Sequence, residues 1–410
     1  MMDNFFHVHT IDQVFDLIQD FPRVDVETLS IDQALDHVLA KDFAAPEDLP
    51  DFPRATMDGY AVRAASTFGA TESNPALLTL TGIIDMGQKP DFSVGIGEAA
   101  RIATGGMLPE GADAVVMIEY TDPVDDDTIE VYKSVAPGTH VVAIGEDFSK
   151  HDVLIPAGKR LRPQEIGLLA AFGIQTVHAY RKPRIGIIST GDEIVPIHEI
   201  PGPGKIRDIN TYTLSGLVAS SGAIPVSFGL VADHFETLQH ICERALNEMD
   251  MVLVSGGSSV GTRDFTIQAL SAIPDSHLLV HGIAISPGKP TILAKCGNKA
   301  FWGLPGHVVS AMVVFLKIVK PWIDHISGMT HSTSGRLTIP AVLTRNVPSV
   351  HGRTDYIRVR LFEQDNTRWA EPILGKSGLI NTMVRSDGLI EIGMNTEGLN
   401  QGTVVAVEMM

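Results

Sequence analysis

Apolar residues near the start of the chain recur at the spacing of an α-helix. Ile11, Val14 and Ile18 fall on one face of such a helix, and a second apolar set with the same period covers 31–38. We therefore expect two helices in this region. The next stretch, 45–53, is rich in proline, which disfavours helix in the residue before it. It is predicted to be an extended crossing into another domain.

Apolar runs between 54 and 148 are short and are separated by Gly, Pro and Asp. This pattern predicts β structure, with strands over 77–83, 114–120 and 128–135. A helix is expected over 163–172, because Pro163 suits a first helical turn and Glu165 stands near the positive end of the helix dipole.

From Pro183 onward, short apolar runs alternate with helical segments. Strands are expected over 185–189, 224–229 and 251–255, and helices over 211–220, 235–247 and 265–271. Such alternation predicts βαβ units with a parallel sheet and right-handed crossovers. A long helix is expected over 308–323. After Gly328, short strands that end with 403–407 predict a small all-β domain.

Length and charge narrow the classes of partner. A single core stops growing near about 250–300 residues, so the 410 residues predict several domains. The chain has 31 Lys and Arg against 49 Asp and Glu, a net charge of −18. This sign argues against binding nucleic acid or an anionic membrane. An anionic small substrate would need locally concentrated positive charge or a metal ion.

The cysteines and the N-terminus favour a reducing, cytoplasmic location. Cys242 and Cys296 are the two cysteines and lie far apart, so no disulfide framework is expected. The N-terminus lacks the basic and long apolar regions of a signal peptide. The most apolar later stretch, 311–319, contains Lys317 and is too short to span a bilayer.

The densest candidate site lies over 250–264, where a predicted strand runs into a glycine-rich loop and a helix. Glycines let backbone N–H groups approach an anion, and the next helix N-terminus adds positive potential. Asp264 is a carboxylate beside this anion site, a common way to hold Mg²⁺. An ordinary glycine-rich turn is the simpler alternative. The loop supplies Gly256, Gly257, Ser258, Ser259 and Gly261.

The same loop also fits a G-x-S-x-G nucleophile elbow over 257–261, with Ser259 as the nucleophile of a serine hydrolase. This match is weak, because short Gly and Ser patterns recur by chance. No HGGG-type oxyanion segment precedes it.

Two further loops are candidate sites. Glu193 follows a predicted strand and could ligate a metal or act as a base, although a helix-capping turn explains 189–193 equally well. Lys289 is held in Ser-Pro-Gly-Lys-Pro, which limits the entropy that the side chain loses on binding an anion. A plain turn explains this segment equally well.

Other segments suggest little by themselves. The start of the long helix at 303–310 is a possible anion site, although an ordinary helix start is the more frequent explanation. Thr104 and Asp58 stand in predicted turns. The segments 355–358 and 375–378 are more often solvated surface than a site.

Taken in order, these segments resemble one family over nearly the whole chain, the molybdopterin molybdenumtransferases. Its members insert molybdenum into adenylylated molybdopterin, and the E domains of gephyrin and of the plant molybdenum insertase belong to it. Nine pieces match in family order, which is a strong signal. They are Asp48-Leu-Pro50, Met57-Asp-Gly-Tyr-Ala61, Thr104-Gly105, Gly145-Glu-Asp147, Ser189-Thr-Gly-Asp-Glu193, Asp208-x-Asn210, Ser255-Gly-Gly-x-Ser-Val-Gly261 with Asp264, Pro287-Gly-Lys-Pro290 and Leu304-Pro-Gly306.

The resemblance implies an Mg²⁺-dependent reaction of adenylyl-molybdopterin with molybdate, or tungstate, that releases AMP. The matching catalytic positions are Asp58, Thr104, Asp147, Glu193, Asp233, Asp264 and Pro305. Glu193, Asp233 and Asp264 would hold the metal. The 256–261 loop would bind the adenylylated pterin, and Lys289, Ser310, Arg358 and Ser377 would hold molybdate.

The resemblance also implies a homodimer whose sites are shared between subunits, with the molybdopterin adenylyltransferase as a candidate partner. The expected fold is α/β plus β, with several domains. They are an N-terminal helix over 1–27 that packs on the βαβ domain, a discontinuous mixed linker domain over 28–50 and 149–178, a β-rich domain over 51–148, a βαβ molybdopterin-binding-like domain over 179–328 and a C-terminal β domain over 329–410.

Several positions depart from the family pattern. Ser286 and Val142 stand where lysine and arginine are usual, which weakens the expected positive charge around the oxyanion. His307 and Val308 replace the usual asparagine and proline. These departures leave the choice between molybdate and tungstate open.

Three functions follow as alternatives. The first is the transferase, and the second is a non-catalytic pterin-binding or scaffold protein on the same fold. The third is a serine hydrolase that acts through Ser259. The acidic cluster of Asp58, Glu193, Asp233 and Asp264 favours the first, because it would be repulsive without a bound cation.

Overall fold

The computed structural model describes residues 8–256, 260–330 and 337–410, and for 260–264 it describes the backbone alone. The chain divides into two compact units. Unit 1 comprises Met1–Lys41, Ala157–Ala170 and Ile174–Met410, and unit 2 comprises Asp42–Pro156 and Ala171–Gly173. The five-part division stated above stays a prediction.

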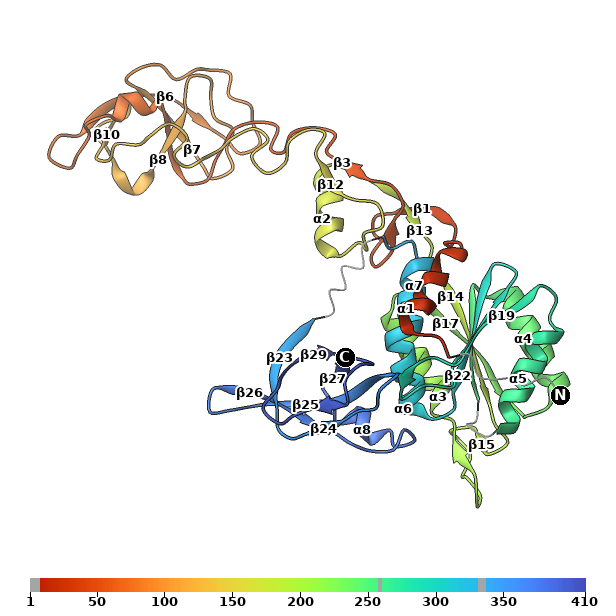
Figure 1. Ribbon diagram of the computed structural model, residues 1–410. Helices are drawn as coiled ribbons and strands as arrows, with labels where there is room; N and C mark the ends of the chain where they lie inside the picture. Colours follow the sequence, from red (N-terminus) through yellow and green to blue (C-terminus); the bar gives the residue numbers. More distant parts are fainter. Residues whose placement is uncertain (1–7, 257–259, 331–336) are drawn as a thin grey trace. The chain divides into compact units, whose positions relative to one another are not determined.

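A six-stranded sheet forms the centre of unit 1 (Figure 1). Its first four strands run parallel, as the βαβ pattern predicts. The last three strands were not predicted, and the last two bring antiparallel pairings into the sheet. In order across the sheet the strands are β17 (Ile224–Val231), β14 (Arg184–Thr190), β18 (Met251–Gly256), β22 (Lys299–Pro305), β21 (Ile292–Cys296) and β19 (Ser276–His281).

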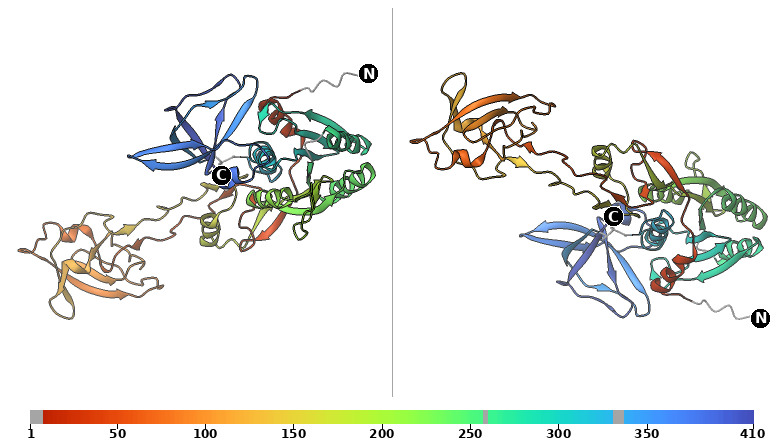
Figure 2. Two further views of the ribbon diagram at one scale, coloured as in Figure 1. Left: turned by 90° about the horizontal axis from the view of Figure 1, so that it is seen from below. Right: turned by 90° about the horizontal axis from the view of Figure 1, so that it is seen from above.

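Helices cover both faces of this sheet, because its central strands are apolar on both sides. Helices α4 (Phe235–Glu248) and α5 (Val260–Ala272) lie side by side on one face (Figures 1 and 2). The other face packs on α3 (Asn210–Ser220) and on a continuous helix, as expected for 308–323. That helix comprises α6 (Val308–Val314), a π-helical turn over Phe315–Val319 and α7 (Lys320–Ile326).

The C-terminal part of unit 1 is a small closed barrel, because pairing between its first and last strands completes the ring. Its interior holds apolar side chains such as Val359, Ala370 and Ile390. In order around the ring the strands are β25 (Thr354–Gln364), β26 (Thr367–Pro372), β23 (Thr338–Leu343), β29 (Val404–Met409) and β27 (Gly388–Ile392). Outside the ring, β20 (Ile285–Ser286) pairs with β25, and β24 (Val347–Pro348) pairs with β28 (Gly398–Leu399). The short helix α8 (Asn381–Val384) belongs to the same part of the chain.

The N-terminal prediction is confirmed for the first helix and wrong for the second. α1 (Ile11–Asp16) forms and continues as a 3₁₀ turn. The 31–38 segment is instead a series of turns between β1 (Val26–Ser30) and β2 (Val38–Leu39), which pair with β13 (Thr176–Tyr180). Asp36 has a φ of 65°, and its N–H donates to Leu161 O rather than along a helix. Tertiary hydrogen bonds therefore override the helical spacing.

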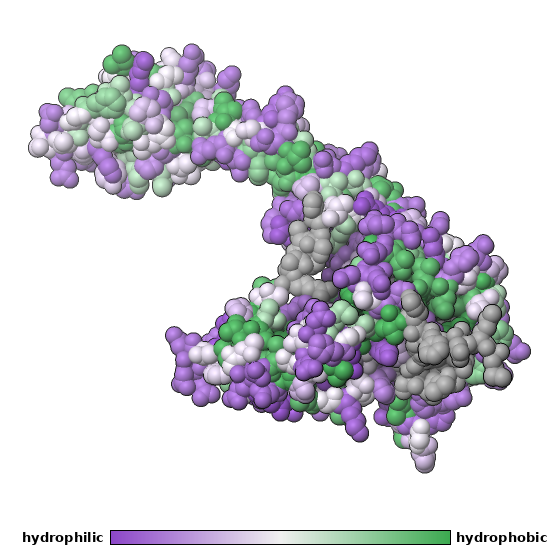
Figure 3. Space-filling model, viewed as in Figure 1, coloured by the Kyte–Doolittle hydropathy of each residue, from purple (hydrophilic) through white to green (hydrophobic). Residues whose placement is uncertain are grey.

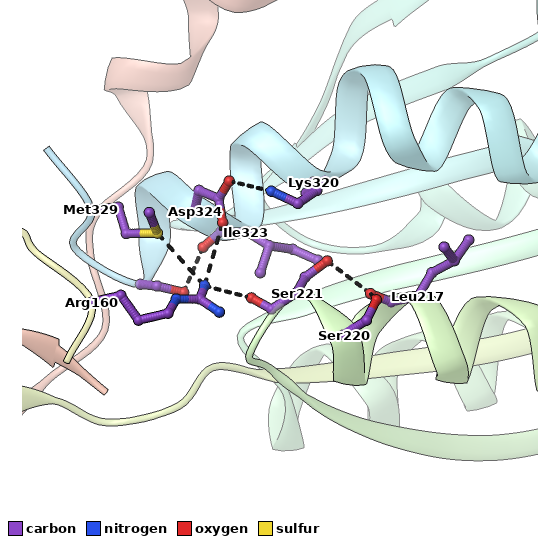
Figure 4. A network of polar contacts seen from close by, with 9 residues as sticks. Arg160, Leu217, Ser220, Ser221, Lys320, Ile323, Asp324 and Met329 are labelled. Atoms are coloured by element: carbon purple, nitrogen blue, oxygen red, sulfur yellow. Dashed lines mark hydrogen bonds and ion pairs between the residues drawn. The ribbon is translucent and has the colours of Figure 1, made fainter. Parts of the chain in front are cut away.

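Arg160 links this region to the helices of the central sheet (Figure 4). Its guanidinium donates to the Ser221 carbonyl at the end of α3, at 2.7 Å, and pairs with Asp324 of α7 at 3.6 Å. Asp324 also accepts from Lys320 at 2.9 Å. Nearby, α2 (Pro163–Ala171) follows the predicted helix over 163–172.

Unit 2 is built on a six-stranded sheet, as its short apolar runs predict. Its order is β8 (Ala114–Met117), β5 (Gly59–Val62), β7 (Glu98–Ile102), β6 (Ala76–Ile84), β10 (Thr128–Val131) and β9 (Thr121–Pro123). Two short ladders complete it, β4 (Arg54–Ala55) with β11 (Val141–Val142) and β3 (Phe43–Ala44) with β12 (Val153–Ile155). Single 3₁₀ turns lie at Ala64–Thr67 and Ile118–Tyr120.

Hydrophilic side chains are spread over the visible surface of both units, with small apolar patches between them (Figure 3). Within the described part of the chain, no helix has the length and apolar character that a membrane crossing requires.

Candidate functional site

The central sheet of unit 1 has a topological switch point between β14 and β18. The chain leaves β14 through α3 on one face and leaves β18 through α5 on the other. Open α/β sheets bind ligands at the carboxyl ends of such strands. Here Gly256 is close to Thr190, because a Cβ on Gly256 would stand 2.9 Å from Thr190 Cγ2. Gly256 is also the register partner of Pro305 at the end of β22.

Two predicted metal ligands follow neighbouring strands at this edge. Asp233 follows β17, and its carboxylate accepts the Thr190 hydroxyl at 2.5 Å. The Asp233 N–H donates to the Asp192 carboxylate at 3.2 Å. The Glu193 carboxylate lies against Gly191, where a Cβ would come within 2.9 Å of it. The structure thus gathers the acidic loops after β14 and β17 at one edge of the sheet.

Part of the predicted loop lies outside the residues that the structure describes. Gly257, Ser258 and Ser259 lie outside the described residues. Gly261 and Asp264 lie in α5, and their side chains are not described. Within the described ranges, no three His, Cys, Asp or Glu side chains gather as a metal site would require. The three-carboxylate metal site therefore stays a prediction.

Asn210 ties two of these strand ends together. It is 6% exposed, and its amide nitrogen donates to the Ser255 hydroxyl at the end of β18 and to the Gly306 carbonyl after β22, the latter at 2.8 Å. The Gly306 carbonyl fixes the amide orientation, because a flipped amide would place two oxygens together. Asp208 stabilises the start of α3 by accepting the Thr211 N–H at 3.1 Å. A cavity of about 90 Å³ borders Asn210 and His307.

Three of the residues predicted to hold molybdate, Lys289, Ser310 and Ser377, lie on α6 or on loops that contact it. Gly288 lies directly on α6, because a Cβ there would stand 2.3 Å from Val314 and 3.8 Å from the Ser310 carbonyl oxygen. The neighbouring Lys289 is exposed, whereas Ser310 is buried. On the barrel side, the Ser377 carbonyl accepts the Val309 N–H at 3.0 Å.

Arg358 lies in the barrel strand β25 and points toward the same loop as Ser377. Its guanidinium donates to the carbonyl of Gly375 at 3.1 Å and to that of Ile373 at 3.4 Å. Its Nε is buried without a hydrogen-bond partner in the described structure. Burial lowers the pKa of the Arg358 guanidinium, which nevertheless stays charged because an arginine starts from so high a value.

Unit 2 pairs two of its predicted catalytic residues. The Asp58 carboxylate accepts the Thr104 N–H at 2.6 Å and the Thr104 hydroxyl at 2.8 Å. These bonds lower the pKa of Asp58, with the backbone bond the larger cause. Asp147 does not join this pair. Its N–H donates to the Leu49 carbonyl, so it lies at the other end of the ladder that 49–55 forms with 141–148.

Comparisons with known proteins agree over most of the chain. The model described as MoeA N-terminal region (domain I and II) matches residues 9–173, a probable molybdopterin binding domain matches 186–325, and the MoeA C-terminal region (domain IV) matches 340–410. A Bacillus subtilis protein named molybdopterin molybdenumtransferase is 31% identical over 93% of this chain and 89% of its own length. A Haemophilus influenzae protein of the same name is 32% identical, over 95% and 94%.

A solved structure agrees with these relatives. The Pyrococcus horikoshii molybdopterin biosynthesis protein is 31% identical, with a TM-score of 0.83 over 98% of this chain and 100% of that one. The chain belongs to the molybdopterin molybdenumtransferase family. Its multidomain α/β plus β architecture is the one that the resemblance implies.

The structure shows which residues lie next to the four positions that depart from the family pattern. His307 Nδ1 lies 2.8 Å from the Ser377 hydroxyl, so it takes part in holding the loop at the start of α6. Val308 is buried in the core between α6 and the sheet. Ser286 is in β20, opposite Asp355. Val142 stands directly opposite Arg54.

Sequence reasoning assigned no structural role to Asn210 or to Arg54. Asn210 was recognised as part of a motif, but nothing in the sequence shows that its amide joins β18 to the end of β22. Arg54 was not singled out at all. The signal that could have found it is a single cation in an otherwise acidic stretch just before Asp58.

Proposed function

We propose that this chain transfers molybdenum from molybdate to adenylylated molybdopterin and releases AMP. The observation that carries the proposal is the convergence of the loop after β14, Gly256 and Pro305 at the switch point of the sheet. Strand ends of this kind receive nucleotides and related ligands in open α/β folds. The names of the relatives support the same activity.

The positively charged side chains at the site suit the binding of two anionic substrates. Lys289 is exposed on the loop that packs on α6, and Arg358 and Ser377 stand on the barrel side of the same helix. These groups suit a tetrahedral dianion such as molybdate or tungstate. Cleavage of the phosphoanhydride needs positioning and charge stabilisation more than a strong base. The lowered pKa of Asp58 suits an anionic acceptor rather than a proton donor.

We infer that Mg²⁺ binds at the acidic edge of the sheet. Glu193 and Asp233 offer carboxylate oxygens there, the ligands that this ion prefers, and Asp264 in α5 is the third candidate. When bound, the ion neutralises phosphate charge. The Thr190 hydroxyl would orient the Asp233 carboxylate, and the Asp192 carboxylate would hold its backbone.

We further propose that the active form is a homodimer with shared sites, and that the molybdopterin adenylyltransferase supplies the adenylylated substrate. Light scattering should give twice the mass of the chain. A stable monomer with full activity would contradict the shared site.

The test of the function is AMP release from purified adenylyl-molybdopterin. The transferase should release one AMP per molybdenum inserted, and only with molybdate or tungstate present. A pterin-binding scaffold would bind the substrate and leave it intact. Labelling by a fluorophosphonate probe, lost in Ser259→Ala, would instead support a serine hydrolase.

A further inference from the structure

Unit 2 carries most of the negative charge of the chain. It holds 20 Asp and Glu residues against 6 Lys and Arg, so its net charge is −14 out of the −18 of the whole chain. An oxyanion that approaches the Asp58–Thr104 pair therefore meets a repulsive field unless a cation stands close by.

Arg54 is placed to be that cation. It lies four residues before Asp58, in β4, and forms a bridge with Met107, three residues after Thr104. The neighbouring backbone bonds, Gly105 N–H to Ala55 O at 2.7 Å and Ala55 N–H to Gly106 O at 2.9 Å, fix β4 against the Thr104 turn. The backbone around Arg54 is therefore joined to the Thr104 turn, and Thr104 in turn binds the Asp58 carboxylate.

The Arg54 side chain points away from the core. Ala55 and Val141, which are opposite each other, both pack in the apolar core of unit 2. Successive side chains of a strand alternate between its faces, so Arg54 and its partner Val142 share the outer face. Arg54 is exposed, and no hydrogen bond or ion pair joins its guanidinium to the described residues. Its N–H donors are therefore available to a ligand.

We propose that Arg54 binds a tetrahedral oxyanion of the reaction, a phosphate group of the adenylylated substrate or molybdate, beside the Asp58–Thr104 pair. The inference rests on the proposed function and adds a substrate-binding residue to it. A guanidinium binds such an oxyanion through two parallel hydrogen bonds, which the compact ammonium of a lysine does not reproduce. Because Val142 shares the outer face, an arginine at either position reaches the same space.

The test compares Arg54→Ala with the double variant Arg54→Ala/Val142→Arg. Arg63→Ala is the matched control, because Arg63 is an exposed arginine of the same unit at the far end of β5. Half-saturating concentrations of adenylyl-molybdopterin and of molybdate are measured by AMP release. AMP and molybdate are also titrated separately by calorimetry. Thermal unfolding followed by circular dichroism checks that each variant is folded.

Arg54→Ala should raise one half-saturating concentration about tenfold, as expected for loss of a charge-assisted hydrogen bond. The double variant should recover most of this loss, and the effect should shrink as salt rises. If the half-saturating concentration of adenylyl-molybdopterin rises and AMP binds more weakly, Arg54 binds the phosphate group. If molybdate binds more weakly instead, Arg54 binds the metal oxyanion.

Unchanged affinities in Arg54→Ala would overturn the proposal, and so would a double variant as weak as the single one. An equal loss in Arg63→Ala would show a general field effect and overturn it as well. A wild-type protein that releases no AMP would contradict the proposed function instead. In that case the two calorimetric titrations still decide whether Arg54 binds an oxyanion.

Discussion

The Asp58 carboxylate receives two hydrogen bonds from Thr104, one from its N–H and one from its hydroxyl, at 2.6 and 2.8 Å. The two residues come from motifs 46 positions apart in the chain. Both bonds favour the ionised carboxylate and so lower the pKa of Asp58. Asp58 therefore keeps its negative charge throughout the neutral range.

Thr104→Val should raise the pKa of Asp58 toward its ordinary value of 3.8, because the hydroxyl bond is lost while the backbone bond remains. The Asp58 carboxyl signal, followed by NMR during an acid titration, reports this change. Thr104→Ser keeps the hydroxyl and serves as the control. An unchanged midpoint in the valine variant would show that the hydroxyl does not contribute.

Glu165 should make the stability of unit 1 depend on pH. Hydrogen bonds from Arg162, and a further contact from Lys159, lower the pKa of Glu165 from 4.5 to about 2, although burial acts in the opposite direction. Its folded pKa is lowered, so its contribution is complete above pH 4.5 and is lost as the pH falls toward 2. Glu165→Gln should lower the free energy of unfolding at pH 7 by about 1–3 kcal/mol.

Urea unfolding at pH 7 and at pH 3 measures the Glu165 effect. The difference between wild type and Glu165→Gln should narrow at the lower pH. Glu248→Gln is the control, because its ion pair with Arg244 is exposed and should contribute less than about 0.5 kcal/mol. If wild type and Glu165→Gln differ in free energy of unfolding by the same amount at pH 7 and at pH 3, titration of Glu165 is ruled out as the cause.

Asn210→Ala should destabilise the fold by about 1–3 kcal/mol, because the Gly306 carbonyl and the Ser255 hydroxyl lose their shared donor. AMP release should fall more than stability alone explains, since both partners lie at the strand ends where we propose that the substrate binds. Ser220→Ala, at the exposed end of the same helix, should change neither. Normal activity and stability in Asn210→Ala would show that the strand ends do not need this bridge.

Asp233→Asn should lower AMP release about 10- to 100-fold, the usual cost of disturbing a metal site. The asparagine oxygen can still accept the Thr190 hydroxyl, so the change removes charge and little else. Activity should also need Mg²⁺ and be lost on chelation. Glu236→Gln, an exposed neighbour in the first turn of α4, is the control. Full activity of Asp233→Asn without added Mg²⁺ would contradict the metal assignment.

The periodic parts of the chain could be predicted from the sequence, and the parts fixed by tertiary contacts could not. β14, β17 and β18 were predicted because buried parallel strands are short apolar runs, and their helices follow from the spacing. The 31–38 segment has helical spacing, yet Asp36 bonds to Leu161 across the fold. Motif order pointed to Asp58 and Thr104, but it could not reveal that one carboxylate accepts both donors, or that Arg54 stands opposite Val142.

The most direct test of the proposed transferase activity is the fate of adenylyl-molybdopterin mixed with the purified protein, Mg²⁺ and molybdate. Chromatography of the reaction follows AMP and intact substrate, and molybdenum bound to the pterin is measured in the same samples. A transferase should form AMP and molybdenum-bound pterin in equal amounts, with neither formed when molybdate and tungstate are left out. Substrate that binds the protein but stays intact, with molybdate present at saturation, would contradict it.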